Sequence, residues 1–274
     1  MCEQLESQAA KYNEVRNPFG VKAILNLIEP GDVVLDGGCG TGQHAYHLAT
    51  KASQVIGIDT DVARIAIAQS HCPDLNNVTF EVGSVTQLPF EDNSFDVVLL
   101  AQVLHHLAGK NGFTQAELRQ QCRQALLEAK RVLRMEGRLI LVTTSRIQRR
   151  VAYWHFNFFP PSAWEKLDPI WSLTEDEWFT SVMAELGFLP IGNVTPSESH
   201  WREEEDETIV KLGLDPSWRA TDVAFDLLNA TQLDEFVTQV KAVLTDGSVS
   251  ELINTARLGR LSHGEATVFA YQLS

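Results

Sequence analysis

One segment of the sequence decides the fold class, Val33-Val34-Leu35-Asp36-Gly37-Gly38-Cys39-Gly40-Thr41-Gly42. Its first half, with Asp32, is an apolar run that predicts a short buried strand. Its second half is rich in glycine, which lets the backbone turn sharply and approach a ligand without an intervening Cβ. The helix expected over Thr41–Thr50 offers unpaired backbone N–H groups at its start. These features indicate a ligand-binding loop between a strand and a helix.

Outward from this loop, strands and helices alternate. Further strands are expected over Gln54–Asp59, Asn77–Val82, Phe95–Ala101 and Arg138–Thr144. Helices are expected from Glu3 to about Glu29 with a break at Asn17-Pro18, over Val62–Ser70, and from the capping box Thr114–Glu117 to about Arg134. Alternation at this spacing predicts a parallel sheet of an α/β domain.

The regular alternation of strands and helices ends after Thr144. Residues 145–172 are rich in aromatic side chains, and a helix capped by Thr174 is expected to end near Gly187. A strand is expected over Phe188–Val194, a helical stretch over Thr208–Arg260 with a cap at Thr231, and a last strand over Glu265–Leu273. The simplest organisation is a single domain, 1–274, with a core of about 20–144, 173–199 and 264–274 and lid insertions at about 145–172 and 200–262.

The second strand ends on Asp59, where a carboxylate can accept both hydroxyls of a ribose. The loop and this carboxylate together indicate a cofactor that contains adenosine, without separating NAD from S-adenosylmethionine. Residues 40–45 even satisfy a loose G-x-G-x-x-A pattern. A dinucleotide fingerprint should begin directly after the strand, however, whereas Gly40 lies further along the loop, and this register disfavours NAD.

The loop resembles motif I of the class I S-adenosylmethionine-dependent methyltransferases, in which an acidic residue is followed by G-x-G-x-G. Asp36 matches the acid, and Gly38, Gly40 and Gly42 match the glycines. Matches to later family motifs follow in order at Val55–Asp59, Val82–Phe90, Ser94–Val98, Leu104–Leu107 and Arg131–Gly137. The resemblance implies a Rossmann-like three-layer sandwich, with a mostly parallel seven-stranded sheet, an antiparallel last strand and helical lid insertions.

The resemblance also implies which residues hold S-adenosyl-L-methionine and its product S-adenosyl-L-homocysteine. They are Asp36, Gly38, Cys39, Gly40, Gly42, Asp59, Thr60, Ser84, Val85, Gln102 and Tyr12. The chain departs from the family pattern at Gly37, where a larger apolar residue is usual, and at Ser84, where an Asp commonly holds the adenine amino group. Gln102 has an alternative role as a polar loop residue, and Tyr12 as a core residue.

Methyl transfer requires mainly alignment of the acceptor with the sulfonium methyl group, and no metal is expected. A general base would serve a hydroxyl acceptor, and His105 and His106 follow the fourth strand at its carboxyl end. The alternative is that one of them orients the loop. The predicted acceptor residues are Trp154, His155, Phe158, Phe159, Trp164 and His200. The aromatic run has two interpretations, the lining of an acceptor pocket or the packed underside of a lid.

The net charge of −14 disfavours a nucleic-acid partner. One basic cluster, Arg146, Arg149 and Arg150, is interpreted as a solvated helix face, with anion binding as the alternative. No apolar run has the length of a membrane span, the acidic N-terminus does not resemble a secretory signal, and the cysteines are scattered, so a cytoplasmic protein is expected. A small-molecule acceptor is the leading hypothesis. A protein methyltransferase and a non-catalytic cofactor-binding scaffold are the alternatives, and the oligomeric state is left open.

Overall fold

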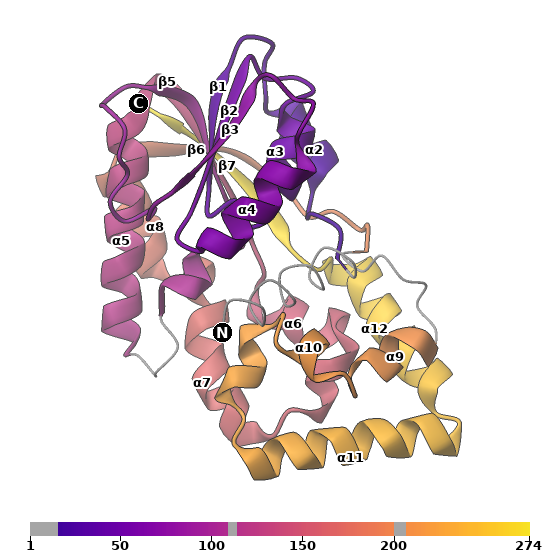
Figure 1. Ribbon diagram of the computed structural model, residues 1–274. Helices are drawn as coiled ribbons and strands as arrows, with labels where there is room; N and C mark the ends of the chain where they lie inside the picture. Colours follow the sequence, from indigo (N-terminus) through magenta and orange to yellow (C-terminus); the bar gives the residue numbers. More distant parts are fainter. Residues whose placement is uncertain (1–15, 109–113, 200–206) are drawn as a thin grey trace. The chain divides into compact units, whose positions relative to one another are not determined.

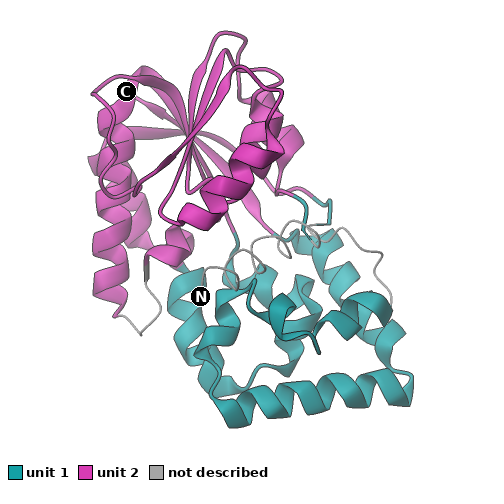
Figure 2. Cartoon of the chain, viewed as in Figure 1, with its two compact units in different colours: residues 1–17, 144–172, 197–265 teal, residues 18–143, 173–196, 266–274 magenta. Residues whose placement is uncertain are grey.

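The computed structural model describes residues 16–108, 114–199 and 207–274. It divides into two compact units (Figure 2). Unit 1 comprises residues 1–17, 144–172 and 197–265, and unit 2 comprises residues 18–143, 173–196 and 266–274. The sequence placed the borders between core and insertions at about residues 144, 172, 199 and 263. The borders between the two units lie after residues 143, 172, 196 and 265. Tyr12 and His200 lie outside the described residues.

Unit 2 is built on a seven-stranded sheet in the order β3-β2-β1-β4-β5-β7-β6. The strands are β1 Val33–Gly37, β2 Gln54–Asp59, β3 Val78–Val82, β4 Phe95–Ala101, β5 Leu133–Thr143, β6 Phe188–Val194 and β7 Thr267–Leu273. The pairings from β3 through β5 are parallel, and β7 runs antiparallel to both β5 and β6. The expected mostly parallel sheet with an antiparallel last strand is therefore confirmed.

Helices cover both faces of this sheet and complete three layers. Figure 1 shows α2, α3 and α4 on one side of the strands and α5 and α8 on the other. The helical elements of unit 2 are α2 Val21–Asn26, α3 Gln43–Leu48, α4 Val62–His71, η1 Leu104–Ala108, α5 Gln115–Val132, η3 Leu173–Glu175 and α8 Glu177–Glu185. The capping box of Thr114 and Glu117 starts α5 as expected, whereas α8 is capped by Asp176 and not by Thr174.

The core of unit 2 lies between the sheet and α5 with α8. It joins the buried side chains of Leu35, Val98 and Leu139 on the strands to those of Leu126 and Val182 on the helices. Strand β4 is buried along most of its length, as expected for a central strand covered on both faces. Burial of these apolar side chains is the main source of stability for the sheet that carries the loops.

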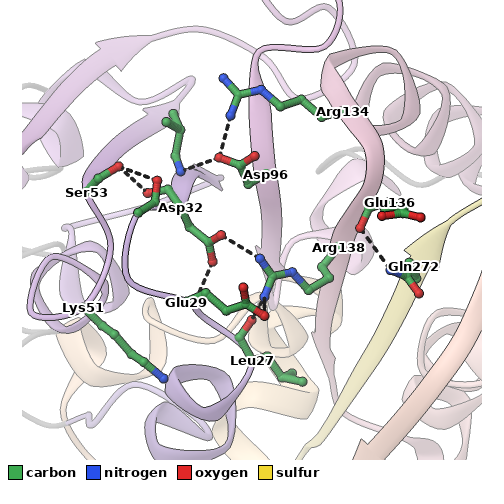
Figure 3. Close-up of polar contacts among 12 residues, drawn as sticks. Leu27, Glu29, Asp32, Lys51, Ser53, Asp96, Arg134, Glu136, Arg138 and Gln272 are labelled. Atoms are coloured by element: carbon green, nitrogen blue, oxygen red, sulfur yellow. Dashed lines mark hydrogen bonds and ion pairs between the residues drawn. The ribbon is translucent and has the colours of Figure 1, made fainter.

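Charged residues hold the amino ends of β1, β4 and β5 together. Figure 3 shows Arg138 beside Asp32, with Arg138 Nη2 donating to Asp32 Oδ1 at 2.6 Å. Arg138 also donates to the carbonyl of Leu27 at 2.8 Å, and the Asp32 carboxylate accepts the Glu29 N–H at 2.6 Å. Asp96 accepts both the Val33 N–H at 2.8 Å and Arg134 Nη1 at 2.6 Å. The polar groups at this edge are thus paired within the protein.

Unit 1 is helical. Its elements are α6 Arg146–Ala152, η2 Trp154–Phe158, α7 Pro161–Trp171, α9 Glu207–Leu212, α10 Pro216–Arg219, η4 Val223–Leu227, α11 Ala230–Asp246 and α12 Val249–His263. The stretch expected to be helical from Thr208 to Arg260 consists of the separate elements α9, α10, η4, α11 and α12. The cap expected at Thr231 was wrong, because Asn229 caps α11 in a capping box with Gln232.

Candidate functional site

The predicted cofactor residues of unit 2 gather at the carboxyl ends of neighbouring parallel strands. Gly37, the last residue of β1, is in register with Ile58 of β2 and Leu100 of β4. The loops that leave these strands therefore start side by side, in the place where open α/β sheets bind ligands. The glycine loop, Asp59 and Gln102 all belong to this edge of the sheet.

The glycine loop is shaped by hydrogen bonds to β2. The N–H groups of Gly38 and Cys39 both donate to the carbonyl of Ile58, at 2.7 and 3.0 Å. Gly38 has a φ of +70°, and a Cβ at this position would lie 2.5 Å from a methyl carbon of Val103. Only glycine fits this left-handed and crowded position. A Cβ on Gly40 would have Arg64 Nη1 as its nearest neighbour, at 3.9 Å. A ligand can therefore approach the backbone of the loop at Gly40.

Asp59 ties the end of β2 to the glycine loop. Its Oδ2 accepts the Gly40 N–H and its Oδ1 accepts the Asp61 N–H, both at 2.9 Å. A carboxylate has about four lone-pair sites, so both oxygens keep acceptor capacity for a ribose hydroxyl. The half-buried Asp59 is therefore oriented by the protein before any ligand binds, whereas the next residue, Thr60, is exposed.

Asp36 is a buried carboxylate with an open acceptor position. Only 1% of its surface is exposed, and among the described residues its Oδ2 has no hydrogen-bond partner. The pKa of this carboxyl is raised to about 7, chiefly by burial and also by the nearby Asp59, and against a hydrogen bond from the Ala45 N–H that lowers the pKa. An orphaned buried acceptor is costly unless a ligand satisfies it. A cationic or hydrogen-donating group of a ligand would fit this position.

The other predicted cofactor residues surround the loop. Cys39 is buried, and its burial raises the pKa of the thiol. Gly42 has a φ of +79° and caps α3. Ser84 and Val85 follow β3, and Val85 lies close enough that a Cβ on Gly37 would come within 3.1 Å of its methyl carbon. Gln102 follows β4 with a left-handed φ of +58°, a conformation that is uncommon outside glycine and concentrated at functional sites.

The two candidate bases lie in η1, directly after β4. Their ring centroids are 4.1 Å apart, but their exposures differ, because His105 is 8% exposed and His106 is exposed to solvent. The His106 N–H donates to the carbonyl of Val103, the residue that packs on Gly38. The structure thus brings both histidines to the edge of the sheet that carries the glycine loop.

The predicted acceptor residues that the structure describes belong to unit 1, where several form its core. Trp154, His155 and Phe159 are buried, while Phe158 and Trp164 are partly exposed. The core also contains Trp218, stacked on Trp154 at 5.7 Å, and Phe225, stacked on His155 at 5.7 Å. Packing therefore accounts for the three buried residues, and an acceptor contact remains a prediction.

The interpretation of Arg149 as part of a solvated helix face was wrong. Its side chain is 6% exposed, and its Nη1 donates to Asp222 at 3.0 Å. The guanidinium also lies 4.0 Å from the ring centroid of Trp171. Hydrogen bonds and ion pairs with Arg149, His155 and Arg16 hold the pKa of the Asp222 carboxyl well below its usual range, despite burial. Arg146 and Arg150, by contrast, are exposed.

Sequence reasoning missed two residues of α5 that contact the segment after β3. Glu128 accepts the Leu88 N–H, and Arg131 donates to the carbonyls of Leu88 and Phe90. The sequence shows Arg131 only as the first residue of a family motif. The spacing of Glu128 and Arg131 on one helix face was the available signal.

Among the described residues, no cluster of three or more His, Cys, Asp and Glu side chains has the arrangement of a metal site. In the same part of the chain, none of the helices combines the length and apolar character needed to cross a membrane.

The fold and this edge of the sheet define the class of protein, an α/β domain with a glycine loop and a following carboxylate for an adenosine-containing cofactor. Residues 35–141 match the family described as a methyltransferase domain. This segment is therefore similar to a methyltransferase domain, the kind of domain that the sequence motifs predicted.

Relatives and solved structures are consistent with this assignment. The chain is 33% identical over 125 residues to a demethylmenaquinone methyltransferase of Tropheryma whipplei, covering 46% of this chain and 47% of that protein. It is 32% identical over 160 residues to a Mycobacterium tuberculosis protein assigned as an S-adenosylmethionine-dependent methyltransferase, covering 58% of this chain and 49% of that protein. These matches thus span about half the length of the curated relatives.

A crystal structure supports the fold over nearly the whole chain. It is that of an Anabaena variabilis protein assigned as a methyltransferase from an antibiotic biosynthesis pathway. The TM-score is 0.66 with 22% sequence identity, and the match covers 93% of this chain and 96% of that chain. At this level of identity the likeness concerns the fold alone.

Proposed function

We propose that the protein transfers the methyl group of S-adenosyl-L-methionine to a small-molecule acceptor. The observation that carries the proposal is the buried Asp36 carboxylate, whose Oδ2 lacks a hydrogen-bond partner among the described residues. It lies on the strand that leads into the glycine loop, next to the preoriented Asp59. These two acceptors fit the cofactor, whose ribose hydroxyls and cationic amino group are hydrogen-bond donors.

In this proposal each residue type has a defined role. Asp59 accepts the ribose hydroxyls, Asp36 pairs with the cationic amino group, and the turn at Ser84 and Val85 holds the adenine. Gln102 contacts the methionyl part, and the backbone of Gly38 to Gly42 allows the close approach. Tyr12, which lies outside the described residues, is proposed to close over the cofactor.

Bound S-adenosyl-L-methionine supplies an electrophilic methyl group, so the chain has mainly to orient the acceptor for in-line displacement. Orientation of this kind can lower a barrier by roughly 7–11 kcal/mol. Where the acceptor carries a proton, we propose His106 as the general base, since its ring is exposed, and His105 as the residue that packs beside it.

For the acceptor, we propose contacts from aromatic side chains of the segment after β5. Phe158 and Trp164 keep exposed surface, whereas Trp154, His155 and Phe159 would act by supporting them from the core. The relative from Tropheryma whipplei bears the name of an enzyme that acts on demethylmenaquinone, a small molecule. Together with the net charge of −14, this name supports a small-molecule acceptor over a nucleic acid. A cytoplasmic location is proposed because the described cysteines are unpaired thiols.

The first test is isothermal titration of the full chain with S-adenosyl-L-homocysteine and, separately, with NAD. We expect binding of S-adenosyl-L-homocysteine alone, and binding of NAD alone would contradict the proposal. Methyl transfer from radiolabelled S-adenosyl-L-methionine to a panel of quinols, phenols and amines then tests turnover. Absence of transfer to small molecules, with transfer to proteins of a cell extract, would favour the protein methyltransferase.

Substitution of Asp59 by Ala tests the assignment of the ribose ligand. The variant loses a charge-assisted acceptor for the hydroxyls and the anchor of the Gly40 N–H. We expect the Kd for S-adenosyl-L-homocysteine to rise by about a hundredfold, from the loss of hydrogen bonds worth roughly 1.5–3 kcal/mol in total. Asp61→Ala is the matched control, because Asp61 caps α4 through the Ala63 N–H and should leave the Kd within about threefold.

A further inference from the structure

Two side chains of α5 form a rigid pair beneath the segment that follows β3. Arg131 Nε donates to Glu128 Oε1 at 3.0 Å, and Arg131 Nη2 donates to Glu128 Oε2 at 2.8 Å. This pair raises the pKa of Arg131 and lowers the pKa of Glu128, chiefly through the hydrogen bonds between them. A two-bond arginine–carboxylate contact fixes the direction of the remaining guanidinium donors.

The pair holds Leu88 through both of its backbone groups. Glu128 Oε2 accepts the Leu88 N–H at 2.8 Å, and Arg131 Nη2 donates to the Leu88 carbonyl at 3.0 Å. Arg131 Nη1 donates in addition to the Phe90 carbonyl at 2.7 Å. The side chain of Leu88 is 6% exposed, so both its polar and its apolar groups are fixed.

Leu88 ends the turn that presents Ser84 and Val85. The Gln87 N–H donates to the Ser84 carbonyl at 3.1 Å, and the hydroxyls of Ser84 and Thr86 lie 2.8 Å apart. At its other end the turn is joined to β2, because the Gly83 N–H donates to the Asp59 carbonyl at 3.0 Å. The turn is thus fixed at both ends, by a hydrogen bond to Asp59 at the end of β2 and by the hydrogen bonds from Leu88 to Glu128 and Arg131 of α5.

We propose that Glu128 and Arg131 are positioning residues for adenine recognition. They act through Leu88, and they hold Ser84 and Val85 in the conformation that distinguishes adenine from other bases. This inference rests on the proposed function. Arginine suits this role, since lysine presents a single point charge and cannot bind Glu128 and two carbonyls in one plane.

The test compares two ligands across two variants by isothermal titration of the full chain. The ligands are S-adenosyl-L-homocysteine and S-inosyl-L-homocysteine, which has an oxygen in place of the adenine amino group. For Arg131→Lys we expect the Kd of the adenosyl ligand to rise about tenfold, and the preference for it over the inosyl ligand to shrink by a similar factor.

Arg123→Lys is the matched control on the same helix, because Arg123 pairs with Glu185 of α8. Both its Kd for the adenosyl ligand and its preference should equal those of the wild type. Equal weakening of both ligands by Arg131→Lys would overturn the proposal, since a merely structural role lowers both affinities alike. A wild type without preference between the ligands would overturn it as well.

Glu128→Gln provides an independent variant in case Arg131→Lys does not fold. Because the two residues act as one unit, the double variant should weaken binding by less than the product of the two single effects. Multiplicative effects would contradict a shared role.

Amide hydrogen exchange of the ligand-free protein separates this inference from the proposed function. We expect the Gln87 and Leu88 amides to exchange faster in Arg131→Lys than in Arg123→Lys. Unchanged exchange would overturn the role of the pair in holding the turn. A wild type that fails to bind S-adenosyl-L-homocysteine would refute the proposed function, and with it the role in adenine recognition, while the exchange rates still decide whether the pair holds the turn.

Discussion

Asp32 and Asp36 lie at opposite ends of β1, and their surroundings are opposite in kind. At the amino end, Asp32 accepts hydrogen bonds from Arg138 and the Glu29 N–H. At the carboxyl end, Asp36 is buried beside Asp59, and its Oδ2 has no hydrogen-bond partner among the described residues. Carboxylates paired within the protein stabilise the fold, whereas a buried unpaired carboxylate destabilises the free protein and stabilises a complex. The comparison separates the structural edge of the sheet from the functional one.

The largest expected effect is the pH dependence that Asp36 gives to stability. Its pKa in the folded protein, about 7, is raised above the ordinary 3.8, so the folded state holds the proton more tightly than the unfolded state. The contribution of Asp36 to the free energy of unfolding should therefore be largest below about pH 4 and be lost as the pH rises through about 7, by up to about 4 kcal/mol. Asp36→Asn removes this decline, which urea unfolding from pH 4.5 to pH 8 would measure. Parallel stability curves for variant and wild type would contradict the assigned environment.

The same carboxyl should couple cofactor binding to pH. If ionised Asp36 pairs with the cationic amino group of the ligand, the wild type should lose affinity for S-adenosyl-L-homocysteine as the pH falls below 7. Asp36→Asn should bind weakly, by about tenfold, and without this pH dependence. An affinity that is independent of pH in both proteins would remove Asp36 from the site.

Asp32→Asn tests the opposite end of β1. The substitution removes the charge of the carboxylate that lies 2.6 Å from Arg138, whose side chain is 16% exposed, and leaves the more distant Glu29 carboxylate at 3.5 Å. We expect a loss of about 3 kcal/mol in the free energy of unfolding at pH 7. The Kd for S-adenosyl-L-homocysteine should stay within about twofold, because this residue lies at the far edge of the sheet from the glycine loop. A large loss of affinity would mean that the two edges are not independent.

A smaller effect on stability distinguishes two glycines that flank β1. Gly31 and Gly38 both have positive φ, but a Cβ on Gly31 meets nothing within 4 Å, whereas on Gly38 it meets Val103 at 2.5 Å. Alanine at Gly31 should cost about 1 kcal/mol of stability from backbone strain alone, and leave binding intact. Alanine at Gly38 should cost about 2 kcal/mol and abolish detectable binding at the concentrations used for the wild type. Calorimetry and titration of both variants would check the difference.

The parts of the fold and site that the sequence predicted depend on local pattern. The apolar strand into the glycine loop, Asp59 at the end of the second strand and the capping box at Thr114 were each encoded within a few neighbouring residues. Caps were less predictable where several polar residues adjoin, since Asp176 and Asn229 start helices in place of Thr174 and Thr231. Side-chain roles that depend on distant partners were missed, as for Glu128 and Arg131.

By itself the sequence determined the alternation of strands and helices, the motif for the methyl donor and the order of the family matches, because these rest on periodicity and spacing along the chain. Only the tertiary structure decided which charges are paired. Arg149 is buried because Asp222, far along the chain, supplies its partner, and Asp36 is left open because no described side chain reaches its Oδ2. The burial and pairing of a charged side chain depend on contacts between segments that are distant in the sequence, and a local sequence pattern does not predict such contacts.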